Sequence, residues 1–217
     1  MKSFYTTSTQ DGPEYRSLLC GRTSDLSRLV DQLSNGRSVA LFGEKRIGKT
    51  SLLYLLRDII NGSIKDYTTK LLDLDLKGQI NILKAKVPKQ RAVYVDLYAL
   101  DAINRKALME LLRQELGNHG LLERSKNEGK WSIPQIFEAV QAALPSGASC
   151  VMLLDEIEVL LQVPESEQIF RNLRSVIQSY ATVRFVLAGQ ELWYKQIKDK
   201  TSPLVRNVER FCVGPAE

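Results

Sequence analysis

One short glycine-containing segment limits the possible folds of this chain more than any other feature. Gly43 to Thr50 reads Gly-Glu-Lys-Arg-Ile-Gly-Lys-Thr and matches the pattern G-x-x-x-x-G-K-[ST] in full. The apolar run 38–42 precedes it, and residues 52–60 follow it with apolar side chains at helical spacing. The sequence therefore predicts a buried strand, a glycine loop and a helix in direct succession, as at the start of an α/β domain.

The residue types in this segment suit a phosphate group. Glycines let successive backbone N–H groups turn toward phosphate oxygens, and the start of the following helix carries partial positive charge. Lys49 is placed to reach the β- and γ-phosphates, and the Thr50 hydroxyl is a Mg²⁺ ligand. We therefore expect a P-loop that binds ATP or ADP with Mg²⁺. A glycine turn with a solvated lysine is the alternative, and it does not account for the flanking strand and helix.

A second motif ends another apolar strand. Residues 150–154 are followed directly by Asp155 and Glu156. Buried strands often end in charged residues at a sheet edge, so the pair alone fits a structural role equally well. In a domain with a P-loop it is a Walker B element, in which Asp155 holds the Mg²⁺ shell and Glu156 orients and polarises the attacking water. This interpretation predicts hydrolysis of ATP.

Gln190 is a third candidate for the site. It follows the apolar run 183–188 and Gly189. If this strand lies between the P-loop strand and the strand of Asp155, Gln190 would face the γ-phosphate and sense it. A strand-end turn with an exposed amide explains the same residues, and the sequence leaves both interpretations open.

Strands and helices alternate along the rest of the chain, which predicts a mostly parallel sheet covered on both faces. The expected strands are 38–42, 92–97, 150–154, 183–188 and 210–213, and the expected helices are 24–34, 51–60, 105–116, 133–144, 165–180 and 191–198.

Residues 63–90 interrupt this alternation of strands and helices. Apolar residues between 72 and 82 alternate with charged or polar ones on both sides of Lys77-Gly78. This pattern favours a hairpin inserted into the domain, and two short helices are the alternative.

Composition narrows the class of protein. The 217 residues suffice for one α/β domain and are too few for two full-sized domains with linkers. We expect a flexible polar arm over residues 1–18 and a single domain over 19–217. No apolar run is long enough to cross a bilayer, so a membrane partner is not expected and a cytoplasmic location is the default. Cys20, Cys150 and Cys212 lack metal-ligand spacing and are interpreted as free thiols.

The charge of the chain does not identify a macromolecular partner. A formal net charge of +5 permits an acidic partner, but the excess is small. Lysines in the 63–90 segment alternate with aspartates, and this favours a solvated face over a nucleic-acid surface. Nucleic acid is therefore a permitted partner but not the favoured one.

Several segments together resemble the AAA+-related ATPases of the STAND and archaeal-ATPase type. Residues 19–26, Leu-Cys-Gly-Arg-Thr-Ser-Asp-Leu, are similar to the F-x-G-R-x-x-E-L signature of that group. Residues 41–53 are similar to its G-x-R-R-I-G-K-T-S-L-L signature. The Asp-Glu pair and the strand ending in Ala-Gly-Gln fit the same pattern. Asp25 replaces the usual glutamate, and Gln190 stands where Ser, Thr or Asn is frequent.

The resemblance implies a three-layer P-loop NTPase fold with a five-stranded sheet in the order 5-1-4-3-2. It implies that Arg22 lies near the base or ribose. It also places these residues around the phosphates: Gly43, Glu44, Lys45, Arg46, Ile47, Gly48, Lys49, Thr50 and Ser51. Family members continue into a helical lid and further modules, so we expect the chain to be the nucleotide-binding part of a larger protein.

Three functions are consistent with these observations. The first is a nucleotide switch of a signalling or regulatory ATPase, which self-associates in the ATP state. The second is a DNA-associated AAA+ ATPase of the replication-initiator or transposition-helper kind. The third is a scaffold that binds nucleotide without hydrolysing it. Sites of the AAA+ type take an arginine from a neighbouring subunit, for which this chain offers Arg171, Arg174, Arg206 and Arg210. Arg171 and Arg174, three residues apart on one expected helix, are better placed to face a neighbour, and a solvated helix face is the alternative role for both.

Overall fold

A five-stranded parallel sheet forms the centre of the protein, with strands in the order β2-β3-β4-β1-β5. The computed structural model describes residues 22–64, 74–100, 102–123, 131–190, 193–195, 199, 202–204 and 206–214. The strands are β1 Ser38–Phe42, β2 Gln90–Asp96, β3 Ser149–Asp155, β4 Val183–Gly189 and β5 Val208–Cys212. The predicted sheet order is therefore confirmed, and every pairing is parallel.

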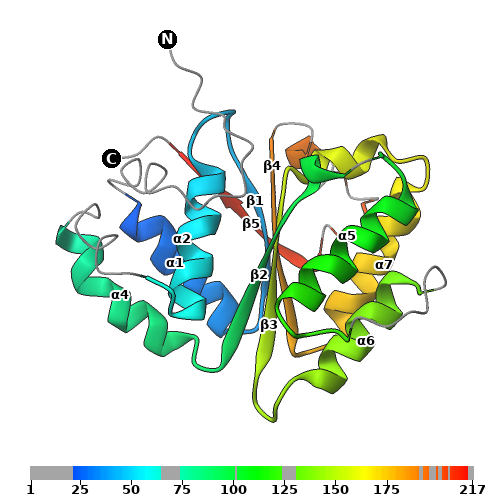
Figure 1. Cartoon of the computed structure of the whole chain (residues 1–217). Coiled ribbons are helices and arrows are strands. Elements are labelled where there is room, and N and C mark those ends of the chain that lie inside the picture. The colour runs from blue at the N-terminus through cyan, green and yellow to red at the C-terminus, as the bar shows by residue number, and fades with distance from the viewer. Residues whose placement is uncertain are drawn as a thin grey trace.

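Helices cover both faces of this sheet and make the three layers seen in Figure 1. On one side lie α1 Thr23–Ser34, α2 Lys49–Asn61 and α4 Leu74–Lys86. On the other side lie α5 Arg105–Asn118, α6 Ile133–Ala143 and α7 Ser166–Ser179. Short 3-10 helices follow two strands, η2 Leu97–Ala99 after β2 and η3 Ile157–Gln162 after β3.

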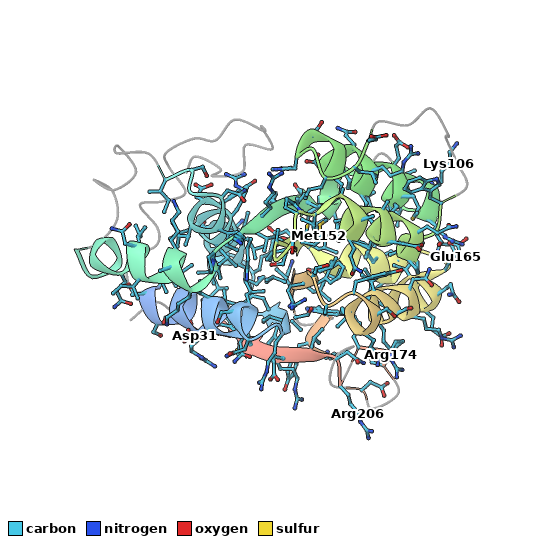
Figure 2. All side chains as sticks on the ribbon, turned by 90° about the horizontal axis from the view of Figure 1, so that it is seen from below. Asp31, Lys106, Met152, Glu165, Arg174 and Arg206 are labelled. Carbon is cyan, nitrogen blue, oxygen red and sulfur yellow. The ribbon has the colours of Figure 1, made fainter. Side chains whose placement is uncertain are left out.

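The sheet separates two apolar cores, and β3 contributes to both. Val151 and Leu153 pack on the side of α1 and α2, whereas Met152 and Leu154 pack on the side of α5, α6 and α7. Met152 lies in the middle of the molecule in Figure 2. A strand buried on both faces has a continuous apolar sequence rather than an alternating one. This explains why the continuous apolar run 150–154 could be recognised as a strand from the sequence.

Residues 74–86 correct one prediction, because they form the single helix α4 and not a hairpin. Ile80, Leu83 and Val87 recur at helical spacing, and the last two are almost fully buried against the neighbouring helices. Ile82 points to solvent with 58% of its surface exposed. The prediction assumed the two-residue period of a strand, whereas the segment has the period of an α-helix. The helix lies outside the sheet, as expected for an insertion, and residues 65–73 lie outside the described residues.

The other elements lie close to their predicted positions. β2 and β5 each begin two residues earlier than expected, and helix 191–198 is described only at residues 193–195, which are helical. Ser132 begins α6 with a capping box to Gln135. The predicted arm, residues 1–18, lies outside the described residues. Within the described part of the chain, no helix has the length and apolar character needed to cross a membrane.

Candidate nucleotide-binding site

The P-loop connects the end of β1 to the start of α2, and two of its glycines have different structural roles. Gly48 has φ 97°, in the left-handed region that favours glycine, and a Cβ there would meet nothing within 4 Å. Gly43 instead lacks space, since a Cβ would lie 2.8 Å from the Val213 carbonyl oxygen. Arg46 also has a positive φ of 67°. The loop is therefore shaped by backbone conformation at one end and by contact with the chain after β5 at the other.

Lys49 folds back over this loop. Its Nζ donates hydrogen bonds to the carbonyl oxygens of Gly43 at 3.1 Å and Glu44 at 2.9 Å, and only 6% of the residue is exposed. Of the other predicted phosphate-binding residues, Glu44, Lys45, Arg46 and Thr50 are exposed, and Gly43, Ile47, Gly48 and Ser51 are half-buried. The ammonium group thus already sits inside the loop, where a phosphate would compete with two backbone carbonyls for it.

Arg22 is hydrogen-bonded to the backbone of the P-loop. Its guanidinium donates to the carbonyl oxygens of Ile47 at 2.6 Å and Gly214 at 2.7 Å, and to the Asp25 carboxylate at 2.9 Å. Only 4% of Arg22 is exposed. Within the described residues these contacts fasten the start of α1 to the P-loop and to the backbone after β5, and the expected position of Arg22 near the base or ribose stays a prediction.

Asp155, at the end of β3, is held by three groups of the protein. Its Oδ2 accepts hydrogen bonds from the Thr50 hydroxyl at 2.7 Å and the Tyr94 hydroxyl at 3.0 Å. Its Oδ1 accepts from the Glu156 backbone N–H at 3.0 Å. The structure therefore brings Thr50 and Asp155 together, as predicted, and adds Tyr94. Nothing in the local sequence around Tyr94 marks it as a site residue.

The environment of Asp155 suits a divalent cation. Burial raises the pKa of Asp155 to about 6, against the lowering effect of the Thr50 hydrogen bond, and only 2% of the residue is exposed. Among the described residues, none of the ion pairs involves Asp155. A buried carboxylate beside a hydroxyl, with no cationic side chain paired to it, offers the oxygen ligands that Mg²⁺ prefers. The donor set therefore fits this metal.

Glu156 lies next to Asp155 in the chain but in a different environment. It has φ 55°, in the left-handed region, and it leads directly into η3. Its Oε2 accepts a hydrogen bond from the Gln190 side-chain amide at 3.1 Å. Because β4 lies between β1 and β3, the condition for Gln190 to reach the site is met. The two predicted catalytic residues are therefore in direct contact.

Glu158 is a further acidic residue beneath this pair. Only 8% of it is exposed, and its Oε2 accepts from the Gln190 backbone N–H at 3.3 Å. Burial is the largest cause that raises the pKa of Glu158, to about 7, and a hydrogen bond with the Glu156 side chain raises it further. A Cβ on Gly189 would lie 2.5 Å from the same Oε2. Sequence reasoning missed Glu158, although its position two residues after Glu156 keeps it near the strand end.

A parallel sheet in this order, with a P-loop after β1 and adjacent carboxylates after β3, defines a P-loop NTPase of the AAA+ type. Residues 30–197 match the family described as the AAA domain. The chain therefore belongs to the AAA domain family.

Solved structures share this fold at low sequence identity. The Orc1 protein of Aeropyrum pernix, solved in complex with DNA, has a TM-score of 0.60 and 14% identity, over 94% of this chain and 50% of its own. Cdc6p of Pyrobaculum aerophilum has a TM-score of 0.59 and 14% identity, over 98% and 48%. A Walker-type ATPase of Pyrococcus abyssi has a TM-score of 0.56 and 19% identity, over 88% and 53%. The chain thus spans about half the length of each. No curated protein matches the sequence significantly.

Proposed function

We propose that the chain is the ATP-binding and slowly hydrolysing switch domain of a larger regulatory ATPase of the STAND or AAA+ kind. The observation that carries this proposal is the 2.7 Å hydrogen bond between the Thr50 hydroxyl and Asp155. It joins the P-loop helix to the end of β3, so two motifs far apart in sequence form one oxygen-lined spot beside the phosphate-binding loop.

In this proposal the residues of the site divide the work between binding and hydrolysis. Residues 43–51 surround the phosphates, and Lys49 exchanges its backbone carbonyl partners for phosphate oxygens. Thr50 and Asp155 hold Mg²⁺, which when bound neutralises charge on the phosphates. Glu156 orients a water molecule toward the γ-phosphate, and Gln190 senses that phosphate while contacting Glu156. Arg22 acts on the nucleotide through the position of the P-loop.

An arginine from a neighbouring subunit would complete the site. Arg171, Arg174, Arg206 and Arg210 are all exposed. Arg171 is paired with Glu167 on its own helix and Arg210 lies within β5, which leaves Arg174 on α7 and Arg206 before β5. The latter two lie at the same end of the molecule in Figure 2. Gln178 of α7 donates a 2.9 Å hydrogen bond to Asn207, which places the segment before β5 beside that helix. Arg174 and Arg206 are therefore the better candidates for an arginine supplied in trans.

Turnover of ATP by the purified chain tests this proposal. Binding of ATP with steady-state turnover on the order of one per minute or less is expected, because an arginine finger carries about 10³ to 10⁵ in rate. Size-exclusion chromatography with light scattering in ATP and in ADP would report self-association. Turnover near one per second by a monomer would show that the site is complete in one chain, and absence of ATP binding would refute the proposal.

A DNA-associated ATPase is the second candidate, because one of the similar structures is an Orc1 protein in complex with DNA. That similarity concerns the fold, so the evidence must come from binding. Fluorescence anisotropy with duplex DNA at increasing salt would separate the two functions, since phosphate contacts make the affinity fall steeply with salt. A salt-dependent, ATP-dependent affinity would favour this candidate. A chain that binds ATP but never hydrolyses it, alone or with its partners, would instead be a nucleotide-stabilised scaffold.

A further inference from the structure

Tyr94 reaches the candidate site from the edge strand of the sheet. It lies on β2, one strand away from Asp155, and its hydroxyl donates to Asp155 Oδ2 at 3.0 Å. Its half-buried ring packs against the core on the side of α1 and α2. A phenylalanine would fill nearly the same space, so packing alone does not explain the hydroxyl.

The hydroxyl completes the fixation of the Asp155 carboxylate. A carboxylate offers about four lone-pair positions for hydrogen bonds or metals. Here Oδ2 accepts from Thr50 and Tyr94, and Oδ1 accepts from the Glu156 backbone. Three of these positions are thus used by the protein itself, from three different elements. The carboxyl plane can therefore not rotate without breaking a hydrogen bond.

A second tyrosine supports the first. The Tyr54 ring on α2 lies with its centroid 4.5 Å from that of Tyr94 at an interplanar angle of 38°, so the two rings pack against each other. An ionised carboxylate only accepts, so the Tyr94 hydroxyl is the donor in its hydrogen bond with Asp155. Burial, and then the charge of Asp155, raise the pKa of Tyr94 above its usual value, so the phenol keeps its proton. Tyr94 therefore remains a donor to Asp155, and the Tyr54 ring packs against its own ring.

We infer that Tyr94 is a positioning residue that fixes Asp155 and, through it, the Thr50 hydroxyl in the geometry that favours Mg²⁺ with the nucleotide. This inference rests on the proposed function, because it concerns the same site. Groups that orient metal ligands from behind typically change metal affinity or activity by about 10 to 100-fold when removed. The contribution of Tyr94 should thus appear only when the metal is present.

ATP affinity measured by isothermal titration calorimetry, in Mg²⁺ and in EDTA, tests the inference. Tyr94→Phe should bind ATP about tenfold more weakly than the original chain in Mg²⁺ and equally well in EDTA. Tyr180→Phe is the matched control, since Tyr180 ends α7 away from the P-loop, and it should change neither value. Tyr54→Leu keeps the direct hydrogen bond between Tyr94 and Asp155 but removes the aromatic ring that packs on Tyr94, and it should show a smaller loss in Mg²⁺. It also serves as the test variant if Tyr94→Phe does not fold.

A double-mutant cycle separates positioning from packing. In an Asp155→Asn background, Tyr94→Phe should have little further effect on Mg²⁺-dependent affinity, because the carboxylate that it positions is gone. An equal loss with and without Mg²⁺, full additivity with Asp155→Asn, or unchanged Mg²⁺-dependent affinity of folded Tyr94→Phe would each overturn the inference. The proposed function is refuted if the original chain does not bind ATP or if Mg²⁺ does not strengthen its binding. The inference, which rests on that function, is then refuted too.

Discussion

Asp155 and Glu156 are adjacent carboxylates at the end of one strand, yet the protein holds them in opposite ways. Asp155 is 2% exposed and accepts hydrogen bonds from α2, from β2 and from the backbone. Glu156 itself has a left-handed backbone conformation. The side-chain amide of Gln190, the residue after β4, donates a hydrogen bond to its carboxylate. One carboxylate is thus built into the sheet and its helix, whereas the other depends on the position of a neighbouring strand end.

These two arrangements allow nucleotide binding and hydrolysis to be separated by mutation. The groups that would hold nucleotide and metal are preorganised by the chain's own hydrogen bonds. The group that would activate water is coupled to Gln190, which lies above the buried Glu158. We therefore expect substitutions on the Asp155 side to change affinity and substitutions on the Glu156 side to change turnover.

Lys49→Ala should have the largest effect. Loss of charge-assisted hydrogen bonds to the phosphates is expected to weaken ATP binding at least about 100-fold, beyond detection in ordinary titrations. Because Lys49 is 6% exposed and bonded to the P-loop carbonyls, the fold must be verified by thermal unfolding without nucleotide. A folded variant with unchanged ATP affinity would remove the P-loop assignment.

Glu156→Gln should separate the two carboxylates. The amide is isosteric and still accepts from Gln190, but it cannot take a proton from water, so turnover should fall about 100-fold. Affinity for ATP with Mg²⁺ should stay within a factor of about two, since the Asp155 side is intact. Normal turnover of the variant, where the original chain hydrolyses ATP, or a loss of affinity as large as the loss of turnover would contradict separate roles for Asp155 and Glu156.

Gly189→Ala should disturb the Glu156 side through packing. A Cβ there would lie 2.5 Å from Glu158 Oε2 and 2.7 Å from Trp193 Cβ, so we expect a loss of about 1 to 3 kcal/mol in the free energy of unfolding. Gly78→Ala is the matched control, because a Cβ there meets nothing within 4 Å and alanine favours the helix. Urea unfolding would measure both. A Gly189→Ala variant as stable as the control would show that Glu158 moves freely.

The last expected effect concerns the pH dependence of stability on the Asp155 side. Burial raises the pKa of Asp155 from 3.8 to about 6, so the folded state binds more protons than the unfolded state between these values. The stability of the original chain relative to Asp155→Asn should therefore fall as pH rises from about 4 to about 6. The expected slope is about 1 kcal/mol per pH unit at its steepest. Urea unfolding in EDTA without nucleotide would measure this slope, and a flat or rising difference would contradict the burial of an ionised carboxylate.

The fold was largely predictable because its strongest signals are local. Continuous apolar runs identified the strands, and the P-loop pattern located the first strand and helix. The 74–86 segment was misassigned because its short alternation fits two periods, and the deciding contacts of Leu83 and Val87 are with helices distant in sequence.

Site residues could be predicted from the sequence only where they belong to a recognisable motif. Thr50 and Asp155 follow from spacing after a strand, and their contact follows from parallel strands that end at the same sheet edge. Tyr94 and Glu158 could not be found in this way, because each acts through a side chain that reaches a neighbouring strand end. Such contacts are properties of the packed sheet and leave no pattern in the linear sequence.

The buried guanidinium of Arg22 connects two parts of the backbone that are far apart in sequence. It holds the carbonyl oxygens of Ile47 in the P-loop and of Gly214 after β5 at the same time. If phosphate binding shifts the P-loop against this anchor, the backbone leaving β5 must respond. By the same free energy of coupling, a ligand that displaces the backbone at Gly214 would then change the affinity for nucleotide by an equal factor.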